Sequence, residues 1–116
     1  MLVTVLKSKI HRATVTDSQL DYEGSITIDS ELIKRANLLI GEKVLVVNLA
    51  NGLRVETYVI EGNPGSGTIC LNGAAAHRFS VGDKVIIMSF VHLSPEEAQT
   101  FRPTRIKVDG KNKVVS

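Results

Sequence analysis

Apolar and polar residues alternate along much of this chain, with the period of two that is typical of half-buried β-strands. The alternation is loose over residues 2–16, which predicts one long strand or two short ones. Nearly continuous apolar runs over residues 43–49 and 84–93 predict two buried strands. Asn51-Gly52 predicts a hairpin, because both residues tolerate positive φ. Further strands are predicted over residues 53–61, 68–72 and 106–108.

Short helices are predicted between these strands. Asp29 or Ser30 can cap a helix through Arg35 or Asn37. Residues 73–77 predict a helical turn. A cap, a first-turn proline and first-turn acids over residues 94–97 predict a helix that ends at Arg102-Pro103, and residues 110–116 read as a polar tail.

The chain repeats itself once, forty-one residues apart. Thr27-Ile28 returns as Thr68-Ile69, and residues 40–46 return, with similar residue types, as residues 81–87. Chance similarity of two strand turns is the alternative explanation. We interpret the repeat as a duplication that builds one closed barrel of six or seven strands, because closure removes exposed strand edges. The halves are then related by a pseudo-two-fold rotation.

Composition narrows the class of protein. The chain has 116 residues, which suits one domain, and it is 43% hydrophobic but only 4% aromatic, so the core is expected to be aliphatic. The net charge of +2 is too small to indicate nucleic-acid binding. The single Cys70 excludes an intrachain disulfide and suits the cytoplasm. No apolar run reaches the ~18 residues of a membrane span, and no signal peptide is evident.

The pair Gly24-Ser25 carries candidate chemistry. It lies where a polar turn runs into the alternating residues 26–28. Glycine allows close approach of the backbone, so the Ser25 hydroxyl could attack the Gly24 carbonyl carbon if the fold strains that peptide. An N-to-O acyl shift, β-elimination and hydrolysis would then leave a pyruvoyl group at position 25.

Two other stretches are candidates for binding. Lys7, Lys9 and His11 share one strand face and could bind an anion, although a solvated edge is favoured by pattern alone. Three small residues follow Gly73, so a ligand could reach backbone N–H groups there, and tight packing explains them equally well.

Several blocks together resemble bacterial aspartate 1-decarboxylases. They run from Lys9-Ile10-His11-Arg12 to Arg102-Pro103 and include Tyr22-Glu23-Gly24-Ser25, Asn51-Gly52, Thr57-Tyr58 and Asn72-Gly73-Ala74-Ala75-Ala76-His77. The resemblance implies a double-psi β-barrel that cleaves itself between Gly24 and Ser25 into residues 1–24 and 25–116. It also implies a pyruvoyl cofactor derived from Ser25 and a homotetramer with active sites at subunit interfaces.

The same resemblance implies a reaction and a set of roles. L-Aspartate would form a Schiff base with the pyruvoyl group, lose CO2 and leave as β-alanine, a precursor of pantothenate. No metal is implied. Tyr58 would protonate the substrate α-carbon, and processing would involve Gly24, Ser25, Thr57 and His11. The residues implied in substrate binding are Lys9, Arg54, Thr57, Asn72, Gly73, Ala74 and Ala75.

Two features depart from a simple carry-over. Val47 stands where the family often has tryptophan, which changes one wall of the expected pocket. Alternation places Thr57 and Tyr58 on opposite faces of a strand, so either the strand is irregular or the site is shared between subunits. The rival functions are a barrel that never cleaves and a small swapped-hairpin DNA-binding protein, which the apolar-Gly-acid-Lys-Val turn also resembles.

Overall fold

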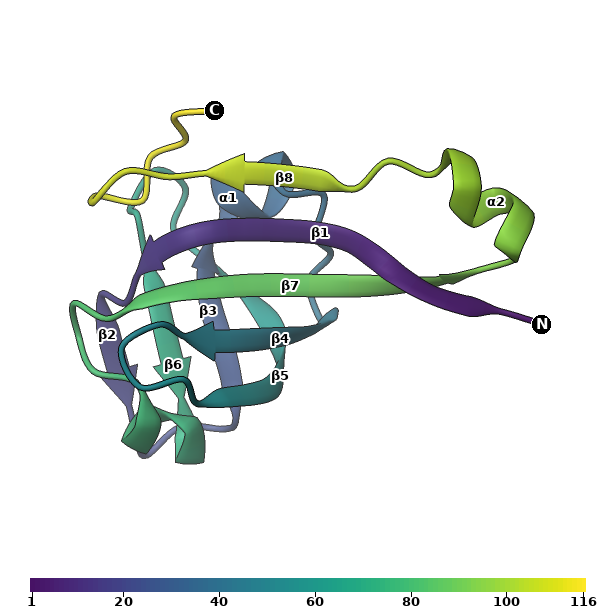
Figure 1. Ribbon diagram of the computed structural model, residues 1–116. Helices are drawn as coiled ribbons and strands as arrows, with labels where there is room; N and C mark the ends of the chain where they lie inside the picture. The colour runs from purple at the N-terminus through teal and green to yellow at the C-terminus, as the bar shows by residue number, and fades with distance from the viewer.

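The computed structural model describes residues 1–116 as one mixed β-sheet with three short helices (Figure 1). The strand order is β2-β6-β3-β5-β4-β7-β1-β8. The strands are β1 (Val3–Thr14), β2 (Asp17–Gln19), β3 (Ser25–Asp29), β4 (Lys43–Asn48), β5 (Arg54–Gly62), β6 (Ile69–Asn72), β7 (Lys84–Leu93) and β8 (Thr104–Lys107). The helices are α1 (Ser30–Arg35), the 3-10 helix η1 (Gly73–Arg78) and α2 (Pro95–Thr100).

The barrel closes because the first nineteen residues cross from one side of the sheet to the other. Strand β1 pairs antiparallel with β7, and the same chain continues into β2, which pairs parallel with β6. At the crossing the Val15 N–H donates to the Asp83 carbonyl at 2.9 Å, and the Thr16 N–H donates to the Ile69 carbonyl at 2.8 Å. The expected count of six or seven strands was too low: there are eight, because one path is broken at the crossing into β1 and β2, and β8 adds an edge.

The register confirms the predicted duplication. Residues forty-one positions apart lie directly opposite each other in two antiparallel pairs, as Ile28 and Ile69 do between β3 and β6, and Val46 and Ile87 do between β4 and β7. Equivalent residues can face each other in this way when a two-fold axis passes between them. The two turns also match, since Gly41 has a φ of 87° and Gly82 a φ of 96°.

Local sequence signals explain the helix ends. The Asp29 carboxylate accepts a hydrogen bond from the Glu31 N–H at 2.9 Å and so caps α1. Asn37, with a φ of 59°, follows the last turn of that helix, as expected for a residue that tolerates the left-handed region. Ser94 and Glu97 form a reciprocal capping box at the start of α2.

The hairpin at Asn51-Gly52 joins β4 to β5 as predicted. Only Gly52 adopts a positive φ, at 75°; Asn51 instead accepts the Leu53 N–H with its side-chain oxygen at 2.9 Å. The hairpin therefore uses the conformational freedom of the glycine and the hydrogen-bonding capacity of the asparagine.

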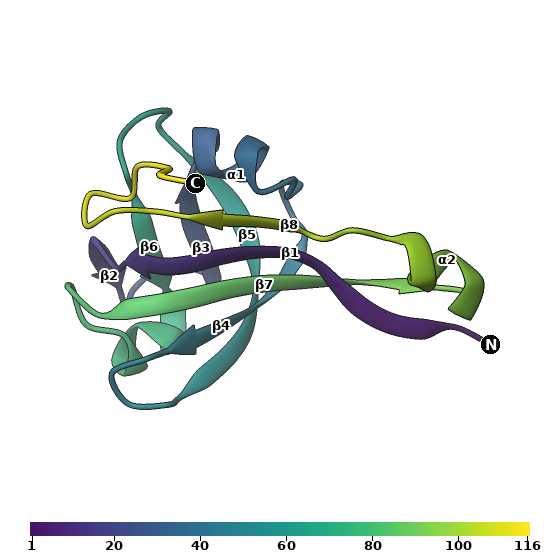
Figure 2. The ribbon, with the colours of Figure 1, turned by 45° about the horizontal axis from the view of Figure 1, so that its top comes forward.

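The core is aliphatic, as the composition predicted. It consists of one cluster of 19 buried residues in which Phe79 is the only aromatic side chain. Burial of this kind contributes ~25 cal/mol for each Å² of apolar surface removed from water. Strands β1 and β7 extend beyond this core toward the N-terminus and α2 (Figures 1 and 2), which gives the molecule a long axis of 42 Å.

Two β-bulges in β1 change the expected placement of its basic residues. The register with β7 shifts between Leu6 and Ser8 and again between His11 and Ala13, which leaves Lys7 and Arg12 as the extra residues. Lys7 therefore does not join Lys9 in an anion site; its Nζ instead donates to Glu42 Oε1 at 2.8 Å.

The predicted polar tail is in fact tied to the barrel. Val108 forms a bridge with Val114, and Asn112 is only 1% exposed. The Asn112 amide donates to the carbonyls of Thr14 at 2.8 Å and Gly67 at 2.7 Å, and its oxygen accepts the Thr14 N–H at 2.7 Å. The expectation of a tail was wrong because polarity alone does not distinguish a solvated segment from one that satisfies buried backbone groups.

We expect Asn112→Ala to lower the free energy of unfolding by about 2–4 kcal/mol, since three buried or partly buried backbone groups lose their partner and alanine is strained at a φ of 61°. Urea titration at fixed protein concentration measures the loss. Lys111→Ala, at the exposed neighbouring side chain, is the control and should change stability by less than about 0.5 kcal/mol. Equal stabilities for the two variants would contradict the structural role of Asn112.

Candidate active site

The Gly24-Ser25 junction lies at the boundary between the surface and the interior, with Gly24 exposed and Ser25 buried. Ser25 is the first residue of β3, directly opposite Asn72 of β6, and is 1% exposed. Its hydroxyl donates to the Glu23 carbonyl at 3.1 Å and accepts from Asn72 Nδ2 at 3.0 Å. The hydroxyl of the nucleophile predicted from the sequence therefore both donates and accepts a hydrogen bond.

Asn72 organises the polar groups around this hydroxyl. Its Nδ2 also donates to the Thr27 hydroxyl at 3.0 Å, and its Oδ1 accepts from the Cys70 thiol, with a sulfur-to-oxygen distance of 3.3 Å. Burial raises the pKa of the Cys70 thiol, and the negative charge of Asp17 raises it further, so the thiol stays protonated and able to donate. The thiol thus fixes which end of the Asn72 amide faces Ser25.

Gly73 brings a second backbone segment against Gly24. A Cβ placed on Gly73 would lie 3.0 Å from the Gly24 Cα and nitrogen and 3.0 Å from the Tyr22 carbonyl oxygen. Gly73 also has a φ of 77°, which side chains other than glycine adopt only with strain. The two predicted blocks around residues 22–25 and 72–77 therefore meet, and only glycine fits at their contact.

Thr57 and Tyr58 lie on the strand next to Ser25. Strand β5 pairs with β4 up to Tyr58, which is opposite Lys43, and pairs with β3 from Val59, which is opposite Ile26. The pairing through Thr57 and Tyr58 is regular, so their side chains do point to opposite faces. Thr57 is half-buried and Tyr58 is 38% exposed. The register therefore rules out the first of the two explanations offered by the sequence, an irregular strand.

Lys9 and His11 lie elsewhere, on the face of β1 next to β8. They line a cavity of about 250 Å³ together with Arg105, Ile106, Lys107 and Ser116, and neither Gly24 nor Ser25 borders it. The buried Nδ1 of His11 has no hydrogen-bond partner. Burial lowers the pKa of the His11 imidazole, and neighbouring cations, Lys9 first among them, lower it further. The region is thus a cationic surface with a free buried polar atom.

Arg54 occupies a third place. It begins β5 opposite Val47, which is buried, and lines a cavity of about 730 Å³. Glu42, Phe90 and His92 line the same cavity. Within one chain the predicted site therefore assembles Gly24, Ser25, Asn72 and Gly73, places Thr57 and Tyr58 beside them, and leaves the cations Lys9 and Arg54 apart.

Sequence reasoning missed Thr27 and Cys70. Both line a cavity of about 550 Å³ with Asn72, on the outside of strands β3 and β6. The sequence did contain a signal for them, because residues two apart on a strand point to the same face. Thr27 thus shares a face of β3 with Ser25, and Cys70 shares a face of β6 with Asn72. Using it would have required the register between β3 and β6.

The fold matches a known barrel class. The crystal structure of the rationally designed mkDPBB_sym_86 protein, a double-psi β-barrel, superposes with a TM-score of 0.51 at 17% identity over 66% of this chain and 90% of that chain. This similarity confirms the predicted double-psi β-barrel. A buried serine that follows an exposed glycine and is faced by the Asn72 amide distinguishes the barrel of this chain as a candidate enzyme.

The chain belongs to the aspartate decarboxylase family, whose model matches residues 1–115. Aspartate 1-decarboxylase from Caldicellulosiruptor saccharolyticus is 62% identical over 99% of this chain and 90% of its own length. The enzymes of the same name from Pelotomaculum thermopropionicum and Corynebacterium efficiens are 60% and 55% identical, over 99% and 100% of this chain and 87% and 85% of their own lengths. The family expected from the sequence is thereby confirmed.

Neither α1, α2 nor η1 approaches the length and apolar character that a membrane-crossing helix requires.

We expect Gly73→Ala to lower the free energy of unfolding by at least ~2 kcal/mol, because the new methyl group meets backbone atoms and forces a strained φ. Chemical-shift changes in the Ser25 amide of the unprocessed protein should accompany the loss. Gly110→Ala is the matched control, since a Cβ at Gly110 meets nothing within 4 Å. A Gly73→Ala protein as stable as the control, with an unchanged Ser25 amide, would show that the close contact with Gly24 does not exist.

Proposed function

We propose that this member of the aspartate decarboxylase family, a carboxy-lyase that converts L-aspartate to β-alanine and CO2, works with a pyruvoyl group made from its own Ser25. The observation that carries the proposal is the buried Ser25 hydroxyl held by Asn72, in a chain that matches the aspartate decarboxylase family from residue 1 to 115. Rival functions find no comparable support in the arrangement of these residues.

Self-cleavage would begin with the Ser25 oxygen. It attacks the Gly24 carbonyl carbon, the carbon–nitrogen bond breaks, and the proton of the hydroxyl passes to the released amine. Loss of the Ser25 α-proton then expels the Gly24 carboxylate, and water converts the remaining enamine to a ketone with release of ammonia. The products are residues 1–24 and a second chain that starts with the pyruvoyl group at position 25.

The residues around position 25 suit this chemistry. Asn72 Nδ2 donates to the serine oxygen at 3.0 Å and, once that oxygen belongs to the ester, still faces it as a neutral donor. Gly73 leaves the Gly24 backbone accessible because it carries no side chain. Thr57 and His11 are the further processing residues that we propose from the family resemblance.

The pyruvoyl group supplies a carbonyl that reacts with the substrate amine and accepts the electron pair released with CO2. The protein's part is to bind, orient and protonate. Tyr58 would deliver a proton to the substrate α-carbon, since a phenol hydroxyl can act as a general acid. Its 38% exposed ring leaves the hydroxyl available to a bound substrate.

Substrate binding requires cations, and the cations lie apart from Ser25 in one chain. Lys9 and Arg54 line two cavities, neither of which includes Ser25 or Asn72. Two carboxylates of L-aspartate need such partners, and arginine offers the bidentate geometry. We therefore propose a homotetramer in which a neighbouring subunit completes the site. Asn72 and the backbone of Gly73, Ala74 and Ala75 would contact the substrate from the Ser25 side.

The proposed compartment is the cytoplasm, because Cys70 is a buried free thiol and the chain has no second cysteine to pair with it.

Ser25→Ala should fold and remain one chain, because it deletes a single hydroxyl from a small side chain, whereas the parent should separate into residues 1–24 and 25–116. Intact-mass measurement after warm incubation distinguishes the two. Borohydride added with aspartate should trap substrate on the larger parent fragment only.

Two results would count against the pyruvoyl mechanism. One is an uncleaved parent that still produces β-alanine. The other is a folded parent that neither cleaves nor decarboxylates, which would favour a barrel without this activity.

Tyr58→Phe keeps the ring and should leave cleavage at Gly24-Ser25 near normal. Loss of the proton donor should lower kcat about 10²–10⁴-fold, the range typical of a general acid. Steady-state kinetics with fully processed protein measure the effect. Turnover at the parent rate would remove Tyr58 from the mechanism.

A further inference from the structure

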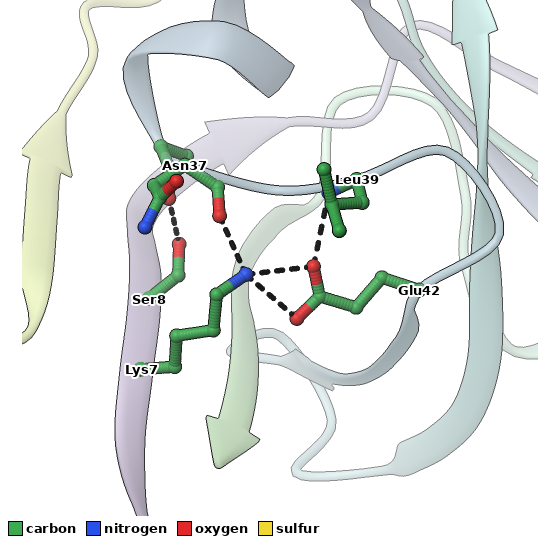
Figure 3. A network of polar contacts seen from close by, with 6 residues as sticks. Lys7, Ser8, Asn37, Leu39 and Glu42 are labelled. Atoms are coloured by element: carbon green, nitrogen blue, oxygen red, sulfur yellow. Dashed lines mark hydrogen bonds and ion pairs between the residues drawn. The ribbon is translucent and has the colours of Figure 1, made fainter.

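A polar cluster at the turn before β4 bears on the position of Tyr58. Lys7 Nζ donates to the Asn37 carbonyl at 2.6 Å and to Glu42 Oε1 and Oε2 at 2.8 and 3.0 Å (Figure 3). The Leu39 N–H donates to Glu42 Oε1 at 2.9 Å. The Lys7 and Glu42 side chains are only 18% and 17% exposed. We name these four residues the Lys7 clasp.

The same arrangement occurs a second time in the chain. Asn48 Nδ2 donates to the Arg78 carbonyl at 2.9 Å and to Asp83 Oδ2 at 2.8 Å, and the Ser80 N–H donates to Asp83 Oδ2 at 2.9 Å. Each of these four residues lies forty-one positions after its counterpart in the Lys7 clasp. The duplication therefore produced the same hydrogen-bond arrangement in both halves of the chain. The donor side chain is the charged Lys7 in the first half and the uncharged Asn48 in the second.

The Lys7 clasp holds the turn that contacts β5. The Gly41 N–H donates to the Val59 carbonyl at 2.7 Å, and the Val59 N–H donates to the Glu42 carbonyl at 3.0 Å. Val59 is the residue at which β5 begins to pair with β3, opposite Ile26. Tyr58 precedes Val59 directly, so the hydrogen bonds at Val59 constrain the backbone that carries the Tyr58 side chain.

Lys7 reaches the turn because of its bulge. As the extra residue of β1 between Leu6 and Ser8, it takes no part in the ladder with β7. Bulges redirect side chains in this way. The Ser8 hydroxyl, next in the chain, donates to the Ala36 carbonyl and ties β1 to the end of α1.

We propose that Lys7 is a positioning residue for decarboxylation: through Glu42 and the Gly41 turn it fixes the crossing of β5 at Val59 and with it the place of Tyr58. The inference rests on the proposed function, in which Tyr58 protonates the substrate. Removing the ammonium leaves the Glu42 carboxylate, which is only 17% exposed, without its cation and with the Leu39 N–H as its remaining donor, which loosens the turn. The β5 backbone beside Ser25 then loses its fixed position.

Lys7→Met tests this, because methionine keeps the apolar stem and removes the charge. We expect hydrogen exchange of the Val59 amide, followed by NMR, to accelerate at least about tenfold. We expect kcat of fully processed protein to fall about tenfold from misplacement of the proton donor, with KM within about twofold. Lys7→Arg keeps charge and donors and should restore most of both. Glu42→Gln provides a second variant if Lys7→Met does not fold.

Glu56→Gln is the control, since Glu56 forms the other ion pair of the chain, with Lys43 at 2.9 Å, and is 64% exposed. It should leave exchange and kcat unchanged. The proposal is overturned if folded Lys7→Met keeps the parent kcat, if Val59 exchange does not change, or if Glu56→Gln has equal effects. A parent protein that neither cleaves nor decarboxylates instead overturns the proposed function, and the exchange measurement identifies that case separately.

Discussion

Two points where the chain changes partners hold this barrel together. Strand β5 leaves β4 after Tyr58 and joins β3 at Val59, and the path from β1 to β2 leaves β7 and joins β6 around Val15. Each crossing residue exchanges two backbone hydrogen bonds with a glycine turn, Val59 with Gly41-Glu42 and Val15 with Gly82-Asp83. A crossing residue without these partners would bury an unpaired N–H and C=O, at ~1–3 kcal/mol for each group.

The crossings also create the candidate active site. Because β5 moves next to β3 at Val59, Tyr58 is brought beside the start of β3, and Ser25 is buried between β5 and β6. Burial leaves the serine hydroxyl dependent on protein partners, which Asn72 and the Glu23 carbonyl provide. A scaffold that withdraws a serine from water and aims an amide at it suits chemistry on the neighbouring peptide bond.

The two candidate substrate-binding cations, Lys9 and Arg54, are not buried with Ser25. Both line surface cavities that do not include the buried Ser25, and water there stabilises their charges. In the site that we propose, a neighbouring copy would supply these cations for the two carboxylates of the substrate without burying unpaired charge in the isolated subunit. The same principle explains the Lys7 clasp, where a partly buried lysine is tolerated because Glu42 and a carbonyl surround it.

The sequence by itself determined the local features: the strands by their period of two, the aliphatic core by composition, the duplication by the repeat, and the family by its motifs. These are carried by residues close together in the chain or by spacing alone. The tertiary structure decided which side chains meet. Asn72 and Ser25 are 47 residues apart, and Asn112 and Thr14 are 98 apart, so their contacts depend on strand register and on where the last segment returns. The bulge at Lys7 likewise has no local signature, because it arises from fitting one strand to its partner, and a shift of one residue there decides whether a lysine faces an open cavity or Glu42.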